Sequence, residues 1–466
     1  MERRAFLKIA GGAALFSLGG VYTARGREAK PPNIIYILAD DLGYADLGCY
    51  GQEVIQTPHI DRMAAEGMRF NQHYAGSTVC APSRACFLTG QHTGHVYVRG
   101  NGDFQLRPSP QDFTVAEQLQ EAGYHTAMIG KASTGCITTP EQPNAKGFDH
   151  FFGYLTHVDA HHYFPEKLYH NGEVIHYPDN HLHEGSHYSH DLFMDDVMRY
   201  LEAHRDGPFF LHWSMQIPHA SLYAPEEWMA QYRGLFEEEP TEQGHYRSEE
   251  EPRTAFAAMV SRMDWEVGQL LEKLTELGIA ENTLVIFVSD NGAMHEGGHD
   301  RFFFDSSGPL KGGKRDLYEG GIRVPHIAWW PGQIAAGAES DHVSAFWDFF
   351  PTACDVAGIE TPEGLDGLSY LPTLLGEDSA QAQHDHLYWE FHEQGGKRAV
   401  RFGDWKAVQL GMSEQPFGDI ELYNLADDLG EANDIASEHP EIVAHARELL
   451  DAAHTPCDIE QFNFPL

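Results

Sequence analysis

The sequence NIIYILADD, at residues 33–41, runs from an almost unbroken aliphatic and aromatic segment directly into two aspartates. Such a run is typical of a β-strand that is buried on both faces, as in a parallel sheet. Similar runs recur at residues 125–129, 208–215 and 284–289. Segments with helical periodicity come before or between them, at residues 60–67, 114–122 and 255–277. The alternation predicts an α/β fold with a large, mostly parallel central sheet and helices on both faces.

The region after about residue 376 has a different character. Residues 376–386 are polar and are interpreted as a linker. Short strand-like segments follow at 387–391, 397–402, 404–410 and 421–424, and a helical segment at 441–453. This pattern predicts a small C-terminal antiparallel sheet with one helix.

Three parts of the chain are predicted: a targeting segment at 1–29, a main domain at 30–380 and a C-terminal subdomain at 381–466. The first part opens MERRAFLK, whose paired arginines resemble a twin-arginine export signal. The apolar stretch at residues 9–20 is too short to span a bilayer. We therefore expect export to the periplasm or the exterior of a bacterium, without stable membrane insertion.

The charge balance is strongly acidic: 31 Lys and Arg face 70 Asp and Glu, for a formal net charge of -39. Such a surface repels nucleic acid and anionic membranes, so no nucleic-acid partner is expected. A solubility or salt adaptation is the alternative reading of the same charge. The six cysteines form no CxxC pair, which argues against both a structural zinc site and a disulfide scaffold.

Acidic and amide side chains directly follow two of the predicted strands. Asp40 and Asp41 end the first strand, and Asp290 and Asn291 follow the strand at 284–289. In an open α/β sheet, ligands bind beyond the carboxyl ends of the strands. Three carboxylates and one amide suit a hard cation such as Ca²⁺ or Mg²⁺. The alternative is that these residues only cap the turns after the strands.

A second candidate site is the segment Cys80-Ala81-Pro82-Ser83-Arg84. Pro82 favours a first helical turn, so Cys80 is expected at a helix N-terminus, where backbone N–H groups favour negative charge. Arg84 follows one turn later. Taken as chemistry, this pattern indicates an electropositive site for a nucleophile. An inert buried cysteine is the alternative.

The segment from Cys80 to Arg84, with Leu88-Thr89-Gly90 behind it, resembles the C-x-P-S-R signature of the type I, formylglycine-dependent sulfatases of the alkaline phosphatase superfamily. Five further segments resemble that family's motifs in the family's order. They are Ala39-Asp40-Asp41-Leu42-Gly43, Ile129-Gly130-Lys131, Pro218-His219, Ser289-Asp290-Asn291-Gly292, and Gly313-Lys314 with Tyr318-Glu319-Gly320-Gly321-Ile322-Arg323-Val324-Pro325. Among family members, the chain looks most like an arylsulfatase-like bacterial glycan sulfatase.

The resemblance implies an alkaline-phosphatase-like α/β/α sandwich and a sulfuric ester hydrolase. It implies that a maturation enzyme oxidises Cys80 to formylglycine, whose hydrate attacks sulfur. It implies Ca²⁺, or alternatively Mg²⁺, held by Asp40, Asp41, Asp290, Asn291 and residue 80. Arg84 would hold the formylglycine oxygens, while Lys131, His219 and Lys314 would surround the sulfuryl group, with His219 or Lys314 as proton donor to the leaving oxygen.

One position departs from the family pattern. Ser133 stands where the family usually has a histidine, two residues after Lys131. We interpret this as a subgroup trait and count Ser133 with four residues expected at a substrate-binding rim: Arg99, Asn101, His161 and His295. The loop that contains His161, at residues 157–190, is rich in His, Tyr and Asn, which suits ligand binding.

The expected substrate is a sulfated carbohydrate, attacked at a terminal sugar. A phosphonate or phosphate monoester hydrolase of the same superfamily is the first alternative. A non-catalytic glycan-binding protein with unmodified Cys80 is the second.

Overall fold

The central strand of the fold is β1 (Asn33–Asp40), which pairs in parallel with β8 on one side and β9 on the other. The computed structural model describes residues 30–134, 139, 142–242 and 244–465, and residues Pro31–Leu466 belong to one unit. The predicted export signal at 1–29 lies outside the described residues and stays a prediction. Within the described part of the chain, no helix has the length and apolar character that crossing a membrane requires.

The large sheet has ten strands in the order β11-β2-β10-β9-β1-β8-β4-β5-β6-β7. From one edge to the other these are Ala338–Ser340, Met68–Phe70, His326–Trp329, Thr283–Ser289, Asn33–Asp40, Phe209–Pro218, His125–Lys131, His150–Tyr154, Lys167–His170 and Glu173–His176. The five strands from β9 to β5 are parallel, whereas β10 and β6 run antiparallel to them, and β7 returns antiparallel to β6. The predicted mostly parallel α/β sheet is confirmed.

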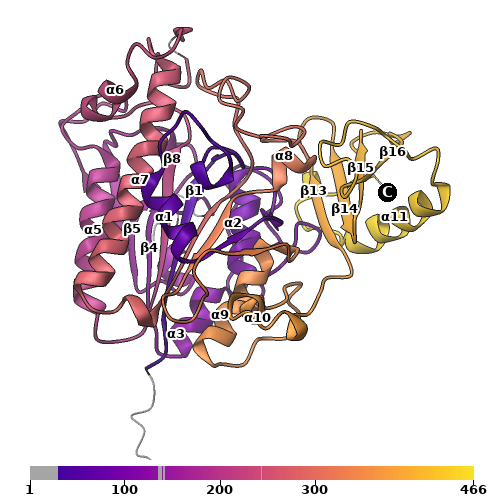
Figure 1. The fold of residues 1–466 in the computed structure, drawn as a ribbon, viewed down its shortest axis with the longest axis horizontal. Helices are drawn as coiled ribbons and strands as arrows, with labels where there is room; N and C mark the ends of the chain where they lie inside the picture. The colour runs from indigo at the N-terminus through magenta and orange to yellow at the C-terminus, as the bar shows by residue number, and fades with distance from the viewer. Residues whose placement is uncertain (1–29, 135–138, 140–141, 243, 466) are drawn as a thin grey trace, which may run out of the picture. The chain divides into compact units, whose positions relative to one another are not determined.

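Helices cover both faces of this sheet, as Figure 1 shows. One face carries α1 (Pro58–Glu66), α5 (Ser189–His204), α6 (Glu226–Tyr232) and α7 (Pro252–Glu276); the other carries α2 (Cys80–Thr89), α3 (Val115–Glu121) and α9 (Phe349–Ala357). The β1 strand explains the two layers, because its side chains alternate between them. Ile34, Tyr36 and Leu38 lie in one core, and Ile35 and Ile37 in the other.

The interpretation of residues 157–190 as loop is wrong in part. They contain the short helix η2 (Asp159–His161) and the hairpin β6–β7, which extends the sheet at one edge. The hairpin turns at Asn171-Gly172, where both residues have positive φ, 49° and 84°. Asn-Gly is the preferred pair for such a two-residue turn, and it is the signal in the sequence that contradicts a loop here.

The predicted C-terminal sheet is present, with four antiparallel strands and one helix. These are β13 (Leu387–Phe391), β14 (Lys397–Phe402), β15 (Trp405–Leu410), β16 (Ile420–Asn424) and α11 (Pro440–Ala453). One face of the sheet packs against Ala446 and Leu450 of α11, while Trp389 and Val408 join the core of the main sheet. The boundary at residue 380 stays a prediction.

A buried carboxylate, Glu390 of β13, joins this sheet to the segment that follows α2. Its Oε1 lies 2.7 Å from Nη1 of Arg99, and its Oε2 lies 2.7 Å from Nδ1 of His454. Burial alone would raise the pKa of Glu390, yet bonds from His392 and His454 and the charge of Arg99 hold that pKa well below its ordinary 4.5. The pair is therefore charged in the folded protein.

Replacing Glu390 by alanine should lower stability strongly, because it leaves the Arg99 guanidinium buried without its carboxylate. The expected loss is about 3–5 kcal/mol of unfolding free energy. Because the folded-state pKa is depressed, the contribution of Glu390 is fully present above pH 4.5 and is lost gradually as the pH falls below 4.5 toward the folded-state pKa. Thermal unfolding of wild type and Glu390→Ala at about pH 7 and about pH 3 measures both effects. A stability gap that did not narrow in acid would contradict the argument.

Candidate active site

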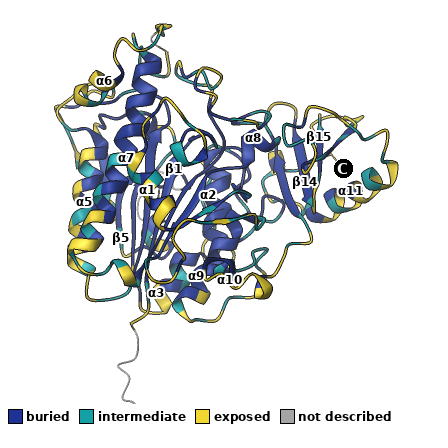
Figure 2. Cartoon of the chain, viewed as in Figure 1, coloured by how far each residue is buried: buried dark blue, intermediate teal, exposed yellow. Residues whose placement is uncertain are grey.

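The first turn of α2 presents Cys80 to the carboxyl ends of the central strands. Every residue of α2 is buried (Figure 2), and Cys80 is only 2 % exposed. The residue before the helix supplies no side-chain cap. Instead, Asn101 Oδ1 accepts a hydrogen bond from the Ala81 N–H at 3.0 Å. Asn101 therefore holds the helix end that carries Cys80, a task that N-cap side chains usually perform.

Around Cys80 the chain gathers two aspartates and a histidine. Its Sγ lies 3.4 Å from Oδ1 of Asp40 and 4.0 Å from Oδ1 of Asp41. With His219, these residues offer ligand atoms that all lie within 4.8 Å of one another. Parallel pairing explains the meeting, because Asp40 at the end of β1 sits opposite Pro218 at the end of β8.

Three buried cations neutralise these carboxylates. Lys131 Nζ lies 2.5 Å from Oδ2 of Asp40, and Lys314 Nζ lies 2.6 Å from Oδ2 of Asp41. Arg84 donates from Nη2 to Oδ2 of Asp290 at 2.8 Å. Buried charges persist only when paired in this way.

Asp290 and Asn291 flank the cluster from the end of β9. Asp290 Oδ1 accepts the Asp41 N–H at 3.0 Å, and Asn291 Nδ2 donates to Asp41 Oδ1 at 2.8 Å. The Asn291 Oδ1 atom is buried and has no hydrogen-bond partner among the described residues. A buried acceptor without a donor is rare and calls for a ligand such as a cation or water.

The pKa shifts at this cluster reflect crowded negative charge. Burial, with Asp40 adding to it, raises the pKa of Asp290 to about 7 despite the contact with Arg84. Burial alone would also raise the pKa of Asp40, but Lys131 and His219 outweigh it and hold that pKa well below its ordinary value. Burial and then Asp40 raise the pKa of the Cys80 thiol well above its ordinary value.

Two conclusions follow for Cys80 and the metal. Burial and the nearby carboxylates outweigh the electropositive surroundings that the sequence predicts for Cys80. An unmodified Cys80 is therefore a poor thiolate nucleophile here. The oxygen-rich set of Asp40, Asp41, Asp290 and Asn291, with one acceptor unsatisfied, fits a hard divalent cation.

His219 has a defined orientation beside this set. Its Nδ1 lies 2.5 Å from the Ala220 carbonyl oxygen, so Nδ1 carries the proton and donates. Its Nε2 therefore faces inward, 3.3 Å from Lys314 Nζ and 3.4 Å from Asp41 Oδ2. Burial lowers the pKa of His219, although Asp41 opposes the shift. The ring stacks on His161 with centroids 4.5 Å apart at 12°.

The residues predicted for a substrate rim are not brought together as one rim. Arg99 is only 1 % exposed and is bound by Glu390 and Thr455, so its assignment to an exposed rim is wrong. His295 is exposed, and its ring lies 6.2 Å from that of Phe302. By contrast, His161 contacts the active-site His219.

Ser133, the position that replaces the family histidine, is 1 % exposed and has a left-handed backbone, φ 66°. Its Oγ is buried without a partner among the described residues. Asp41 is also left-handed, at φ 68°. Non-glycine residues in this conformation are strained and concentrate at functional sites.

The sequence did not single out several residues that hold the site. Ser214 Oγ donates to the Lys131 carbonyl at 2.6 Å and also contacts Arg84 Nη1. Glu296 Oε2 lies 3.0 Å from Lys314 Nζ and accepts from the Tyr246 hydroxyl at 3.2 Å. The only available signal was position, since Glu296 follows Asn291 by five residues on the same strand-end loop.

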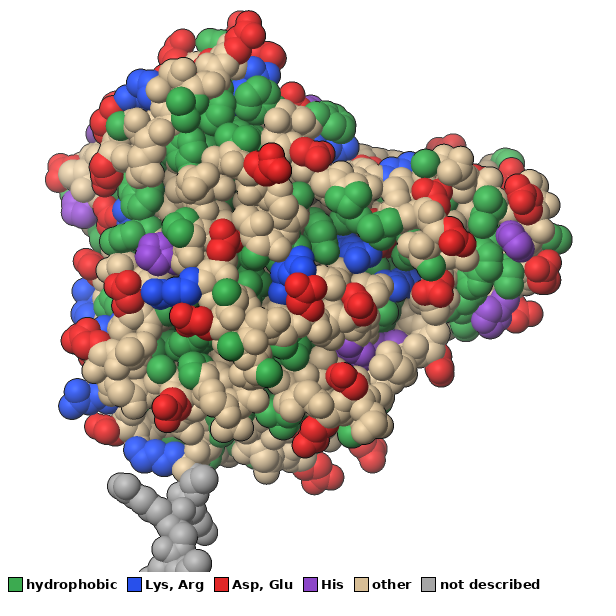
Figure 3. All heavy atoms as spheres, viewed as in Figure 1, with side chains coloured by type: hydrophobic (Ala, Val, Ile, Leu, Met, Phe, Trp, Pro, Cys, Tyr) green, Lys and Arg blue, Asp and Glu red, His purple; other side chains and the backbone are tan. Residues whose placement is uncertain are grey.

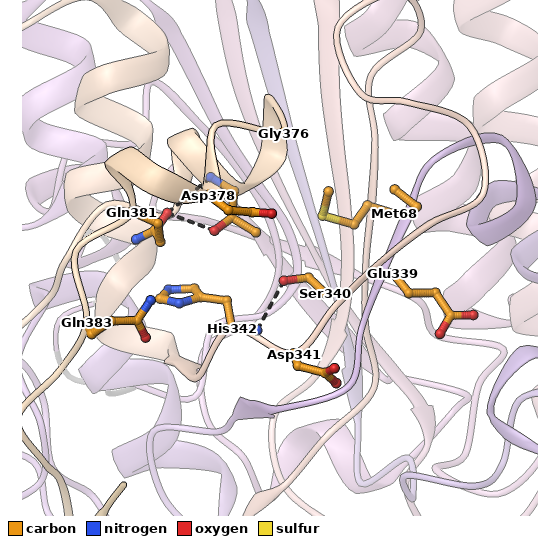
Figure 4. Close-up of a pocket in the computed structure, with 11 residues that line it drawn as sticks. Met68, Glu339, Ser340, Asp341, His342, Gly376, Asp378, Gln381 and Gln383 are labelled. Atoms are coloured by element: carbon orange, nitrogen blue, oxygen red, sulfur yellow. Dashed lines mark hydrogen bonds between the residues drawn. The ribbon is translucent and has the colours of Figure 1, made fainter.

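A cavity of about 490 Å³ lies elsewhere, at the edge of the large sheet (Figure 4). Its lining includes Met68 of β2, Glu339 of β11 and Gln381. None of the active-site residues described above lines it, so it is separate from the candidate active site.

Comparison with known proteins identifies the family. A family model described as Sulfatase matches residues 32–359, and a model described as N-sulphoglucosamine sulphohydrolase, C-terminal, matches residues 312–455. N-acetylgalactosamine-6-sulfatase of Rattus norvegicus is 33 % identical over 379 residues, covering 74 % of this chain and 66 % of the relative, just under two thirds of its length.

Two further comparisons cover almost the whole chain. N-acetylgalactosamine-6-O-sulfatase of Bacteroides thetaiotaomicron is 27 % identical, covering 92 % of this chain and 94 % of the relative. The solved structure titled "Ps i-CgsB in complex with k-i-k-neocarrahexaose" superposes with a TM-score of 0.77 at 28 % identity, covering 91 % of this chain and 93 % of that one. The resemblance drawn from the motifs is confirmed: the chain belongs to the sulfatase family.

Proposed function

We propose that this chain hydrolyses a sulfate ester on a sulfated carbohydrate. The observation that carries the proposal is the position of Cys80, at the start of α2 against Asp40, with buried Lys131, Lys314 and His219 around the same carboxylates. Cations that are fixed before the reaction stabilise charge on the oxygens of a transferred group.

Each residue has a task that its contacts support. Lys131 and Lys314 supply positive charge to the sulfuryl oxygens without reorganising, because both ammonium groups are already held by aspartates. Arg84 fixes Asp290 by hydrogen bonds from Nε and Nη2 to its Oδ2. His219, whose inward Nε2 lies beside Lys314, can exchange a proton with the leaving oxygen.

The family implies two groups that complete this machinery. A calcium ion, held by Asp40, Asp41, Asp290 and Asn291, would supply Lewis-acid charge, and formylglycine made from Cys80 by a maturation enzyme would supply the attacking hydroxyl. The high thiol pKa of Cys80, raised first by burial and then by Asp40, argues against direct attack by a Cys80 thiolate.

The carbohydrate substrate is proposed from the relatives, two of which are named as N-acetylgalactosamine-6-sulfatases and one of which is a complex with k-i-k-neocarrahexaose. Cys80 is buried, which supports action on a chain end that can enter a closed site.

We further propose export through the twin-arginine motif at Arg3-Arg4. Fractionation of host cells that carry Arg3→Lys with Arg4→Lys should show the enzyme retained in the cytoplasm.

Sulfate release should be fastest from small sulfated oligosaccharides and slower, per sulfate, from intact polymer. The comparison uses purified enzyme with an aryl sulfate, sulfated oligosaccharides, the parent polymer, and the matched aryl phosphate and phosphonate esters. Equal rates per sulfate on polymer interior and chain end would contradict exo-action. A higher kcat/KM for the phosphate or phosphonate ester would instead favour the related hydrolase.

A further inference from the structure

A chain of polar contacts leads from the candidate metal cage to the surface through Lys314. Lys314 Nζ lies 2.6 Å from Asp41 Oδ2 and 3.0 Å from Glu296 Oε2. The other oxygen of Glu296, Oε1, contacts Nη1 of Arg315. One carboxylate therefore has a buried lysine on its inner oxygen and an arginine on its outer oxygen.

The backbone holds Arg315 in an unusual conformation at this outer position. Its φ is 75°, a backbone conformation that residues other than glycine adopt only under constraint. Its N–H donates to the Thr78 carbonyl at 3.1 Å, two residues before Cys80, and its carbonyl accepts from Lys397 Nζ at 2.5 Å. Strain that the surroundings fix in this way is typical of functional positions.

The guanidinium of Arg315 is accessible and only partly used. Its side chain is 30 % exposed, whereas that of Lys314 is 3 % exposed. Glu393 lies at 3.9 Å from Nε, and the described residues place no acceptor on Nη2. Arginine presents its donors in a fixed fork that matches carboxylates and sulfates.

The negative charge of the rest of the chain makes a cation near the active site important for binding an anionic substrate. The formal net charge is -39, and acidic side chains are spread over the face drawn in Figure 3. A polyanionic substrate is repelled by such a surface at long range. Affinity for it must then come from cations at short range, beside the reacting group.

We propose that Arg315 binds a second anionic group of the substrate, a sulfate or carboxylate next to the sulfate ester that reacts. This inference rests on the proposed sulfatase function. Glu296 acts as the positioning residue: it holds Arg315 and Lys314 on its two oxygens and so fixes the spacing between the second anion and the reacting sulfate.

A purely structural role predicts a different outcome. If Arg315 only neutralised Glu296, its loss would disturb Lys314 and slow every substrate equally. If Arg315 binds substrate, its loss affects only substrates that carry a second anion, and the effect appears mainly in KM. A panel of substrates separates the two roles.

The experiment compares wild type, Arg315→Gln and Arg315→Lys on four substrates: a neutral aryl sulfate, a monosulfated neutral disaccharide, a disulfated disaccharide and a monosulfated disaccharide with a uronate. We expect Arg315→Gln to lower kcat/KM about tenfold or more on the substrates with a second anion. The other two substrates should change less than about threefold, and Arg315→Lys should recover part of the loss because it keeps the charge. The disulfated and uronate arms identify which anion is bound.

Arg447→Gln is the matched control, because it removes the same charge from an exposed position on α11, in the C-terminal sheet region. It should leave all four rates unchanged. An equal loss on every substrate in Arg315→Gln, or no loss on any, overturns the inference.

Failure of the proposed function is a separate result, namely no sulfate release from any substrate by mature wild type. Calorimetric binding of the disulfated disaccharide to Cys80→Ala protein, with and without Arg315→Gln, tests the inference in that case, since it needs no turnover. Unchanged affinity would overturn it.

Discussion

Cys80→Ala should abolish sulfate release, with a loss of at least about 10⁴-fold in kcat, the scale seen when a nucleophile is removed. A methyl side chain cannot be oxidised to an aldehyde, whereas Lys131, Lys314 and His219 remain in place to bind the sulfate. The fold should survive, because among the described residues the Cys80 sulfur contacts only Asp40 and Asp41 by hydrogen bond. Activity, thermal unfolding and mass spectrometry of the peptide around residue 80 measure the three parts of this expectation.

Cys86→Ala is the matched control from the same helix. Cys86 is also buried in α2, but its Sγ contacts the Gly76 carbonyl, at 3.5 Å, and not the carboxylates. This variant should lose a modest amount of stability and keep its activity. Residual turnover within tenfold of wild type in Cys80→Ala, or an intact thiol at residue 80 in active protein from its native host, would contradict the formylglycine hypothesis.

Much of the fold is predictable because its signals are local. The run from Asn33 to Ala39 has the composition of a doubly buried strand, and β1 lies at the centre of the sheet with neighbours on both sides. The meeting of the strand ends at Asp40 and Asp290 also follows from the sequence, since parallel strands place their carboxyl ends on one edge of a sheet.

The contacts between distant segments cannot be predicted in this way. Arg99 follows the CxPSR helix in sequence, which favours a position at the substrate rim, but its side chain turns toward Glu390, a partner 291 residues away. Its burial depends on where the C-terminal sheet docks, and no local pattern encodes that. Arg315 is a second example, because its left-handed backbone is hydrogen-bonded to Thr78 and Lys397, both distant from it in sequence.

The metal prediction also changes once the contacts of Asp290 are known. Asp290 is a predicted ligand, but its Oδ2 also neutralises the buried Arg84. Asp290→Ala should therefore lose metal, activity and a metal-independent part of its stability together, the last by less than the about 3–5 kcal/mol of a fully broken buried pair, because Arg84 also lies 3.6 Å from Asp40. Loss of activity in this variant alone would not identify a metal site.

Asn291→Ala separates these effects and is the sharper test of the cage. The buried Asn291 Oδ1 has no partner among the described residues, and Nδ2 donates to Asp41 and the Gly292 carbonyl, so no charge loses its counter-ion. We expect at least about a hundredfold loss of activity at low calcium, because an oxygen ligand is removed.

A bound ion at a hundred times its Kd adds about 2.7 kcal/mol to stability. Wild type should therefore unfold at a higher temperature with calcium than with a chelator. Asn291→Ala should lose most of this calcium-dependent difference, and without calcium it should unfold at the same temperature as chelated wild type. Elemental analysis should find about one divalent ion per wild-type chain. Active protein without a divalent ion, or a thermal shift with calcium that Asn291→Ala retains in full, would show that these oxygens serve the fold and not a metal.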